Sequence, residues 1–121
     1  LRGYNSCKSD ERRDLMSDKI KKILRELKKG LTELYGPRLK AVYLYGSYAR
    51  GDYDLNSDLD VMIVLDAYTS YWDELVYSAE LASDLSLEYN VTISRMIMTE
   101  ERWKKGDLPV LRNIRAEGVL A

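Results

Sequence analysis

The sequence predicts a single α/β (α+β) domain over residues 1–121, with a short mixed β-sheet flanked by helices. Apolar residues recur at helical spacing in two segments, and three short runs rich in Val, Ile, Met and Tyr lie between turn residues, as strands do. A chain of 121 residues, 45% hydrophobic and 32% charged, suits one compact domain and leaves little room for a second. Residues 1–16 are expected to form a flexible or partly helical extension.

The first helix is predicted over Ser17–Tyr35, where apolar side chains three and four residues apart form one stripe. Gly30 interrupts the stripe at a cost of about 1 kcal/mol relative to alanine, and Gly36-Pro37 ends the helix. Leu39–Tyr45 follows as a strand, because it is rich in Val and Tyr and is closed by Gly46.

A polar loop, Gly46–Ser57, precedes the second predicted strand, Asp58–Leu65. The loop is too rich in Gly, Asp, Asn and Ser for a core element, so function is expected there. The next helix is predicted to begin at Ser70, because Asp73 completes a variant of the capping box, and to end at Asn90.

The third strand is predicted over Val91–Met98, with an apolar side chain at alternate positions along one face. Thr99, followed by two glutamates, marks the start of a further helix. Asp107-Leu108-Pro109 marks one more, which closes at Gly118. The predicted order of elements is therefore α, β, β, α, β, α.

Two absences exclude whole classes of chemistry. The chain contains no histidine, and Cys7 is its single cysteine. A catalytic histidine, a zinc site of Cys and His ligands and an intrachain disulfide are therefore impossible. Carboxylates, hydroxyls or a metal held by oxygen must carry any catalysis, and Cys7 is expected to be a free thiol.

The net charge of −1 conceals an uneven distribution along the chain. Residues 1–40 carry twelve Lys and Arg against six Asp and Glu, and the rest carry seven against fourteen. We interpret the basic half as a solvated helix face, so nucleic-acid binding is not indicated. No apolar run approaches the roughly 20 residues of a spanning helix. A cytoplasmic protein without membrane attachment is the expectation.

Asp58 and Asp60 are the first candidate site residues. Alternate residues of a strand point to the same face, so the two carboxylates are expected side by side, with backbones about 6 to 7 Å apart. Two such acids repel each other without a counter-charge, and their oxygens suit one divalent cation such as Mg²⁺. Taken alone, Asp-x-Asp is a weak signal.

Gly46 and Ser47 strengthen that signal, because they follow a strand and precede a short helical turn, Ser47–Arg50. A glycine there allows a phosphate to approach the backbone, and the N–H groups and the Ser47 hydroxyl can donate to it. Ten residues separate Ser47 from Asp58. The combination of both motifs at this spacing predicts a nucleotide and metal site.

Other interpretations of this region are weaker. Asp52-x-Asp54-x-Asn56 begins like a calcium loop but lacks the glycine and the glutamate at that loop's sixth and twelfth positions. The Gly46 turn lacks the lysine of a P-loop. Tyr43, Tyr45 and Tyr48 could stack on a base, although the first two are interpreted as core residues.

The motifs Gly46-Ser47-Tyr48-Ala49-Arg50-Gly51 and Ser57-Asp58-Leu59-Asp60 resemble the signature of the minimal nucleotidyltransferases (MNT) of the DNA polymerase beta superfamily, antitoxin type. The resemblance implies a polymerase beta-like fold, in which Gly46 and Ser47 bind nucleotide phosphates and Asp58 and Asp60 hold Mg²⁺. Arg50 also belongs to the motif, and its role in substrate binding or in packing stays open. Leu111–Leu120 resembles the tail of small family members.

The chain departs from the family at one place. The family adds a third aspartate on the neighbouring strand, whereas Val91–Met98 contains no acid and offers only Thr92 and Ser94 as inward candidates. A neutral hydroxyl is a poor base and a poorer ligand for a hard cation. Glu88, the acceptor or water would have to compensate.

Two functions therefore stay open. The first is Mg²⁺-dependent transfer of a nucleoside monophosphate, AMP from ATP, to a hydroxyl of a partner. The second is a weak or inactive nucleotide-binding domain that serves as a partner-binding module, either antitoxin or scaffold. The resemblance implies that the partner is a separate small helical protein of the HEPN type, in a toxin–antitoxin module. Oligomeric state, nucleotide preference and acceptor are not predicted.

Overall fold

The computed structural model describes residue 11 and residues 13–121. The prediction of a flexible or partly helical extension falls mainly on residues 1–10 and 12, outside the described residues. In the described part, the first long helix is α2 (Asp18–Tyr35), and the Ser17 side chain caps it by accepting from the backbone N–H of Ile20. This helix is the one predicted from the apolar stripe.

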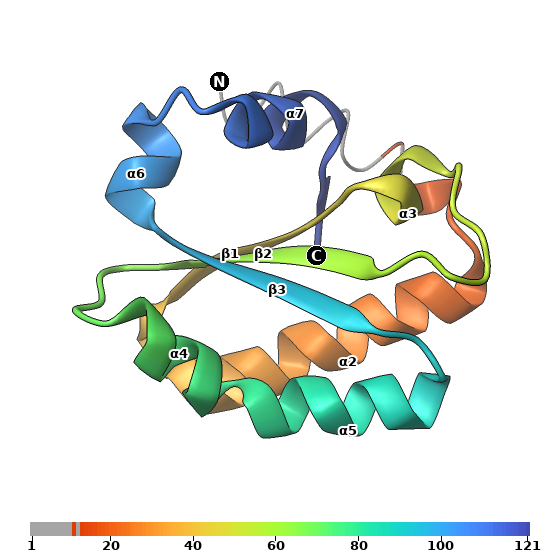
Figure 1. The fold of residues 1–121 in the computed structure, drawn as a ribbon, viewed down its shortest axis with the longest axis horizontal. Helices are drawn as coiled ribbons and strands as arrows, with labels where there is room; N and C mark the ends of the chain where they lie inside the picture. The colour runs from red at the N-terminus through yellow and green to blue at the C-terminus, as the bar shows by residue number, and fades with distance from the viewer. Residues whose placement is uncertain (1–10, 12) are drawn as a thin grey trace.

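The described residues form one four-stranded sheet in the order β3-β2-β1-β4 (Figure 1). The strands are β1 (Leu39–Tyr45), β2 (Leu59–Leu65), β3 (Ile93–Thr99) and β4 (Val119–Leu120). β1 pairs antiparallel with β2 and with β4, and β2 pairs parallel with β3. The predicted short mixed sheet is confirmed, with an additional edge strand, β4, that the sequence did not indicate.

Helices cover both faces of this sheet (Figure 1). On one face lie α2, α4 (Tyr71–Tyr77) and α5 (Ala79–Tyr89). On the other lie α6 (Glu100–Lys105) and α7 (Pro109–Glu117). A short 3-10 turn, Gly36–Arg38, joins α2 to β1. Among the described helices, none has the length and apolarity needed to cross a membrane.

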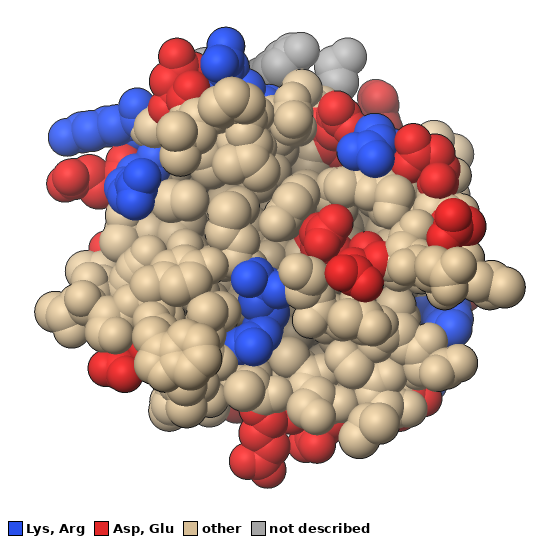
Figure 2. Space-filling view, viewed as in Figure 1, with Lys and Arg blue, Asp and Glu red and all other residues tan. Residues whose placement is uncertain are grey.

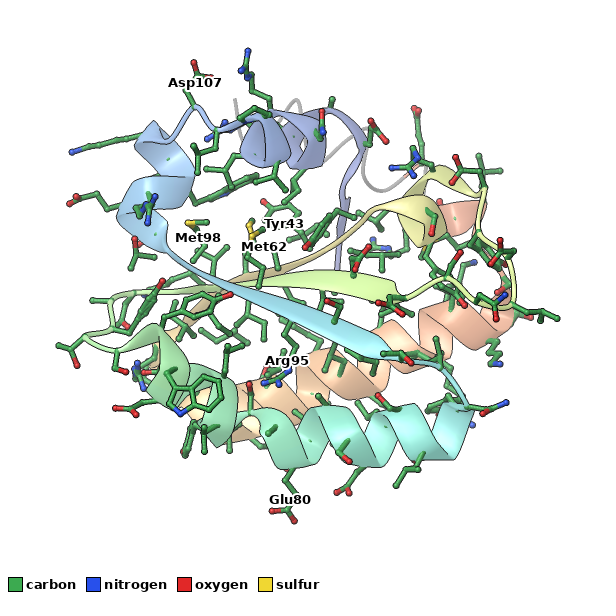
Figure 3. The ribbon with its side chains drawn as sticks, in the orientation of Figure 1. Tyr43, Met62, Glu80, Arg95, Met98 and Asp107 are labelled. Atoms are coloured by element: carbon green, nitrogen blue, oxygen red, sulfur yellow. The ribbon has the colours of Figure 1, made fainter. Side chains whose placement is uncertain are left out.

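The central strand β2 explains the layering, because every residue in it except Asp60 is buried. One face of the sheet packs on α2 and α5 through residues such as Val61 and Ile63. The other packs on α6 and α7 through Met62 and Val64, and Met62 and Met98 point to that side in Figure 3. Asp60 is therefore the one polar interruption of a doubly covered strand.

The single helix predicted from Ser70 to Asn90 is wrong in one respect, because two helices, α4 and α5, occupy that segment. They meet at Ser78, which is buried and has φ −96° and ψ 1°. The Arg95 guanidinium reaches from β3 and donates to Ser78 Oγ at 2.5 Å and to the Leu75 carbonyl at 2.6 Å. These bonds add to those that Ser78 Oγ donates to the Glu74 and Leu75 carbonyls at the break. Helical periodicity alone cannot show them.

Candidate active site

The turn after β1 is built on Gly46, whose φ of 75° and ψ of −156° lie in a region open essentially to glycine. Its carbonyl accepts from the N–H groups of Ala49 and Arg50, each at 3.1 Å, and so begins the short helix α3 (Ser47–Arg50). Gly51, with φ 85°, ends that helix. The predicted helical turn is confirmed, and Ser47 stands at its first position.

The two aspartates stand where the polar loop enters the sheet. Asp58 is exposed and lies immediately before β2, and Asp60 is half-buried as the second residue of that strand. Asp60 lies opposite Tyr45 of β1 and Ser94 of β3. Figure 2 shows acidic atoms at the surface over the start of β2, surrounded mostly by uncharged side chains.

The Gly46 turn and Asp60 are in close contact. A Cβ added at Gly46 would overlap the Asp60 carboxylate at Oδ2. Both the unusual backbone conformation and this contact therefore require glycine at position 46. The structure thus brings together the two motifs that were predicted to share a site, although ten residues separate Ser47 from Asp58.

The carboxylates have no protein counter-charge in contact. Within the described part of the chain, neither Asp58 nor Asp60 forms an ion pair or accepts a hydrogen bond. Burial raises the pKa of Asp60 above its ordinary value, the negative charge of Asp58 raises it further, and Arg50 opposes both. An external cation would relieve this repulsion.

The donor set fits one hard divalent cation. Mg²⁺ prefers oxygen ligands and is commonly held by one or two carboxylates with several waters retained. Asp58 and Asp60 supply such a pair, but the described residues contain no group of three or more His, Cys, Asp or Glu able to hold a metal. Glu88 therefore does not join the pair.

Ser94 occupies the position next to Asp60 on the neighbouring strand, and Thr92 lies exposed just before that strand. β3 (Ile93–Thr99) carries no acidic residue. The expectation of an acid-free strand beside the aspartates is confirmed. The base and the third metal ligand implied by the family resemblance have no counterpart on this strand.

Arg50 forms ion pairs with two acidic side chains. Its guanidinium lies 3.2 Å from Asp52 and 3.7 Å from Glu117 of α7, and all three side chains are partly exposed to solvent. The contact with Glu117 joins the loop to the carboxyl-terminal helix. The binding of nucleotide by Arg50 stays a prediction, and its charge lowers the pKa of Asp60.

Aromatic side chains near the turn divide into two groups. Tyr43 packs on Trp103 with ring centroids 5.0 Å apart, in agreement with its interpretation as a core residue. Tyr48 stacks on Tyr53 at 4.1 Å, and both line a cavity of about 450 Å³ between α3 and the start of α2. Tyr53 was not predicted, because nothing in its loop sequence marks it as a partner of Tyr48.

Comparison with known proteins identifies the family. Residues 18–118 match the model of the nucleotidyltransferase domain. The chain belongs to this nucleotidyltransferase family. Two proteins of Methanocaldococcus jannaschii, both named provisionally as protein adenylyltransferases, are 37% and 40% identical to it over 98 and 78 residues. The matches cover 80% and 64% of this chain and 92% and 78% of those proteins.

Solved structures agree with the fold of this nucleotidyltransferase. A crystal structure of a toxin-antitoxin with AMP-PNP has a TM-score of 0.55 at 19% identity, covering 78% of this chain and 68% of that one. A protein of Sulfolobus solfataricus, named provisionally as a nucleotidyltransferase, has a TM-score of 0.53 at 22% identity, covering 93% and 84%. The predicted family resemblance, fold class and enzyme class are confirmed.

Proposed function

We propose that this nucleotidyltransferase transfers a nucleoside monophosphate, AMP from ATP, to a hydroxyl of a partner protein. Gly46 and Ser47 bind the nucleotide phosphates, and Asp58 and Asp60 are the catalytic carboxylates that hold Mg²⁺. The observation that carries the proposal is the contact between the Gly46 turn and the unpaired Asp60 carboxylate. It allows a phosphate on the turn and a cation on the aspartates to be neighbours.

The chemistry requires a hydroxyl oxygen to attack the α-phosphorus while pyrophosphate leaves and the hydroxyl proton passes to solvent water. Bound Mg²⁺ supplies charge neutralisation on the phosphates. The chain contributes the rest: Gly46 and Ser47 bind the phosphates, with the Ser47 hydroxyl as a donor, and Asp58 and Asp60 hold the cation beside them. Arg50, held between Asp52 and Glu117, keeps the turn against α7.

The relatives support AMP as the transferred group and protein as the acceptor. The two Methanocaldococcus jannaschii proteins are named as adenylyltransferases of proteins. A toxin-antitoxin of the same fold binds the ATP analogue AMP-PNP. We therefore propose ATP as the donor and a separate helical toxin of the HEPN type as the acceptor, with this chain as the antitoxin.

A second function is favoured by one observation, the lack of an acid on β3. Without a third carboxylate, turnover is slow or absent, and the chain serves as a nucleotide-binding antitoxin or scaffold that neutralises its partner by contact. The residues proposed for binding the nucleotide and the metal are all present, namely Gly46, Ser47, Arg50, Asp58 and Asp60. The two functions differ in whether covalent AMP reaches the partner.

One experiment separates them. The protein is incubated with α-labelled ATP, Mg²⁺ and the helical protein encoded beside it, and label on the partner is measured. Asp58→Asn/Asp60→Asn removes the catalytic carboxylates. Glu80→Gln/Asp84→Asn removes the same charge from the exposed side of α5, and Figure 3 shows Glu80 pointing away from the sheet.

Transfer is supported if wild type and the α5 variant label the partner equally and the aspartate variant does so at least a hundredfold more slowly. The binding-module function is supported if all three proteins bind the partner and none labels it. Binding of Mg²⁺ without affinity for any nucleotide would contradict both functions.

A further inference from the structure

Ser94 holds a defined position in the candidate site. Because β2 and β3 are parallel and Asp60 is the register partner of Ser94, the two side chains leave the sheet on the same face. Neighbouring strands lie about 4.8 Å apart, so the Ser94 hydroxyl is beside the Asp60 carboxylate. Ser94 is partly exposed.

The hydroxyl of Ser94 is not used by the fold. Within the described residues it makes no hydrogen bond, in contrast to Ser17, Ser70, Ser78 and Ser86, whose hydroxyls cap helices or bind backbone groups. The next residue, Arg95, points to the opposite face and holds the junction of α4 and α5 (Figure 3). A change at position 94 therefore alters the site and leaves that structural contact in place.

Counting ligands shows why this position matters. Asp58 and Asp60 can share one divalent cation, and a second cation 3.5 to 4 Å from the first, about the usual spacing of two-metal sites, would need a further carboxylate on the Asp60 side. The described residues provide none, and the side chain at that place is the neutral Ser94. A neutral hydroxyl binds a hard cation much more weakly than a carboxylate does.

We propose that Ser94 sets the number of divalent cations at this site: serine leaves one protein-held cation, and a carboxylate at the same position creates a second. The inference rests on the proposed function, since it assumes that Asp58 and Asp60 bind the first cation. It identifies a single position as the specificity determinant for metal stoichiometry.

The test counts Mn²⁺ by electron paramagnetic resonance during titration of the protein bound to a non-hydrolysable ATP analogue. Wild type is expected to hold one Mn²⁺ per complex, with the spectrum of an isolated ion. Ser94→Asp is expected to hold two, with the broadened spectrum of coupled ions. Asparagine has the shape of aspartate without its charge, so Ser94→Asn is expected to hold one Mn²⁺, as is Ser94→Ala.

Circular dichroism and thermal melting establish that each variant is folded. If Ser94→Asp is unstable, Ser94→Glu places the same charge on a longer side chain. Two coupled Mn²⁺ ions in wild type overturn the inference without any variant, and so does a single ion in both folded acidic variants. Failure of the proposed function looks different: wild type then holds no Mn²⁺ with the analogue, or Asp58→Asn/Asp60→Asn holds as much as wild type.

Discussion

Gly46 directly follows the end of β1, and Asp60 lies at the start of β2, yet the two residues are in contact. The backbone of Gly46 is in a conformation that other residues avoid, and its missing side chain leaves the space that the Asp60 carboxylate occupies. Asp60 in turn sits half-buried beside Asp58 with no partner that neutralises it. The repulsion between the two carboxylates is therefore unfavourable in the metal-free site, and a bound cation would relieve it.

Gly46→Ala is expected to damage the site more than the fold. Gly36 has a similar backbone, with φ 56° and ψ −132°, but a Cβ there meets nothing within 4 Å. Both Gly46→Ala and Gly36→Ala should lose about 1–3 kcal/mol of stability from backbone strain. Only Gly46→Ala should also weaken Mg²⁺-nucleotide binding tenfold or more, measured by calorimetry. Equal affinity in the two variants would contradict the contact with Asp60.

Asp60→Asn is expected to raise the stability of the metal-free protein at pH 7. The pKa of Asp60 is raised in the folded state, so the folded protein holds its proton more tightly than the unfolded chain and loses stability as the pH rises through that pKa. Asparagine avoids this loss. The difference in Tm between the variant and wild type should shrink as the pH falls toward the ordinary carboxyl value of 3.8.

Melting curves between pH 3 and pH 8 in EDTA check this, with Asp84→Asn as the control, since Asp84 is exposed on α5. A wild type that is more stable than Asp60→Asn at pH 7 would show that Asp60 has a favourable partner in the folded state. Added Mg²⁺ should reverse the order of the two proteins.

At the scale of elements, local signals were sufficient wherever a cap or a turn decides the boundary. β1 has the predicted bounds, Ser17 caps α2, and Thr99 caps α6 by accepting from the N–H of Arg102. The break at Ser78 and the pairing of β4 with β1 depend on contacts between distant parts of the chain. The same holds for the site. The spacing indicated the two aspartates, but the antiparallel register that sets Tyr45 opposite Asp60 places Gly46 against Asp60.

The junction of α4 and α5 gives a prediction at this scale. Arg95→Met removes the donors to the Leu75 carbonyl and to Ser78 Oγ, which is part of a buried residue. The Leu75 carbonyl then keeps only the 3.4 Å bond from Ser78 Oγ, and that hydroxyl loses the hydrogen bond it accepts. The loss should cost about 1–3 kcal/mol, measured by urea denaturation. Arg95→Lys should cost less, because an ammonium can still reach one of these acceptors. Nucleotide affinity should be unchanged, since Arg95 faces away from Asp60, and a loss of affinity would contradict that separation.

At the scale of the whole molecule, the two core layers hold the site on the most deeply buried strand of the sheet. β2 is buried on both faces, so Asp60 is fixed by the strand that both helix layers cover. The Gly46 turn is attached to the same sheet through β1 and to α7 through the ion pair of Arg50 with Glu117. Ligand binding at this place is therefore coupled to global unfolding, because the site cannot persist once the sheet is lost.

That coupling predicts a large thermal shift. Mg²⁺ with ATP at a hundredfold excess over Kd should stabilise the folded state by about 2.7 kcal/mol, which corresponds to a rise in Tm of roughly 10 °C for a domain of this size. ATP in EDTA should shift the Tm much less, because the triphosphate then meets two uncompensated carboxylates. Glu80→Gln/Asp84→Asn should respond like wild type, whereas Asp58→Asn/Asp60→Asn should lose the dependence on Mg²⁺. An equal Mg²⁺-dependent shift in the aspartate variant would place the nucleotide elsewhere on the molecule.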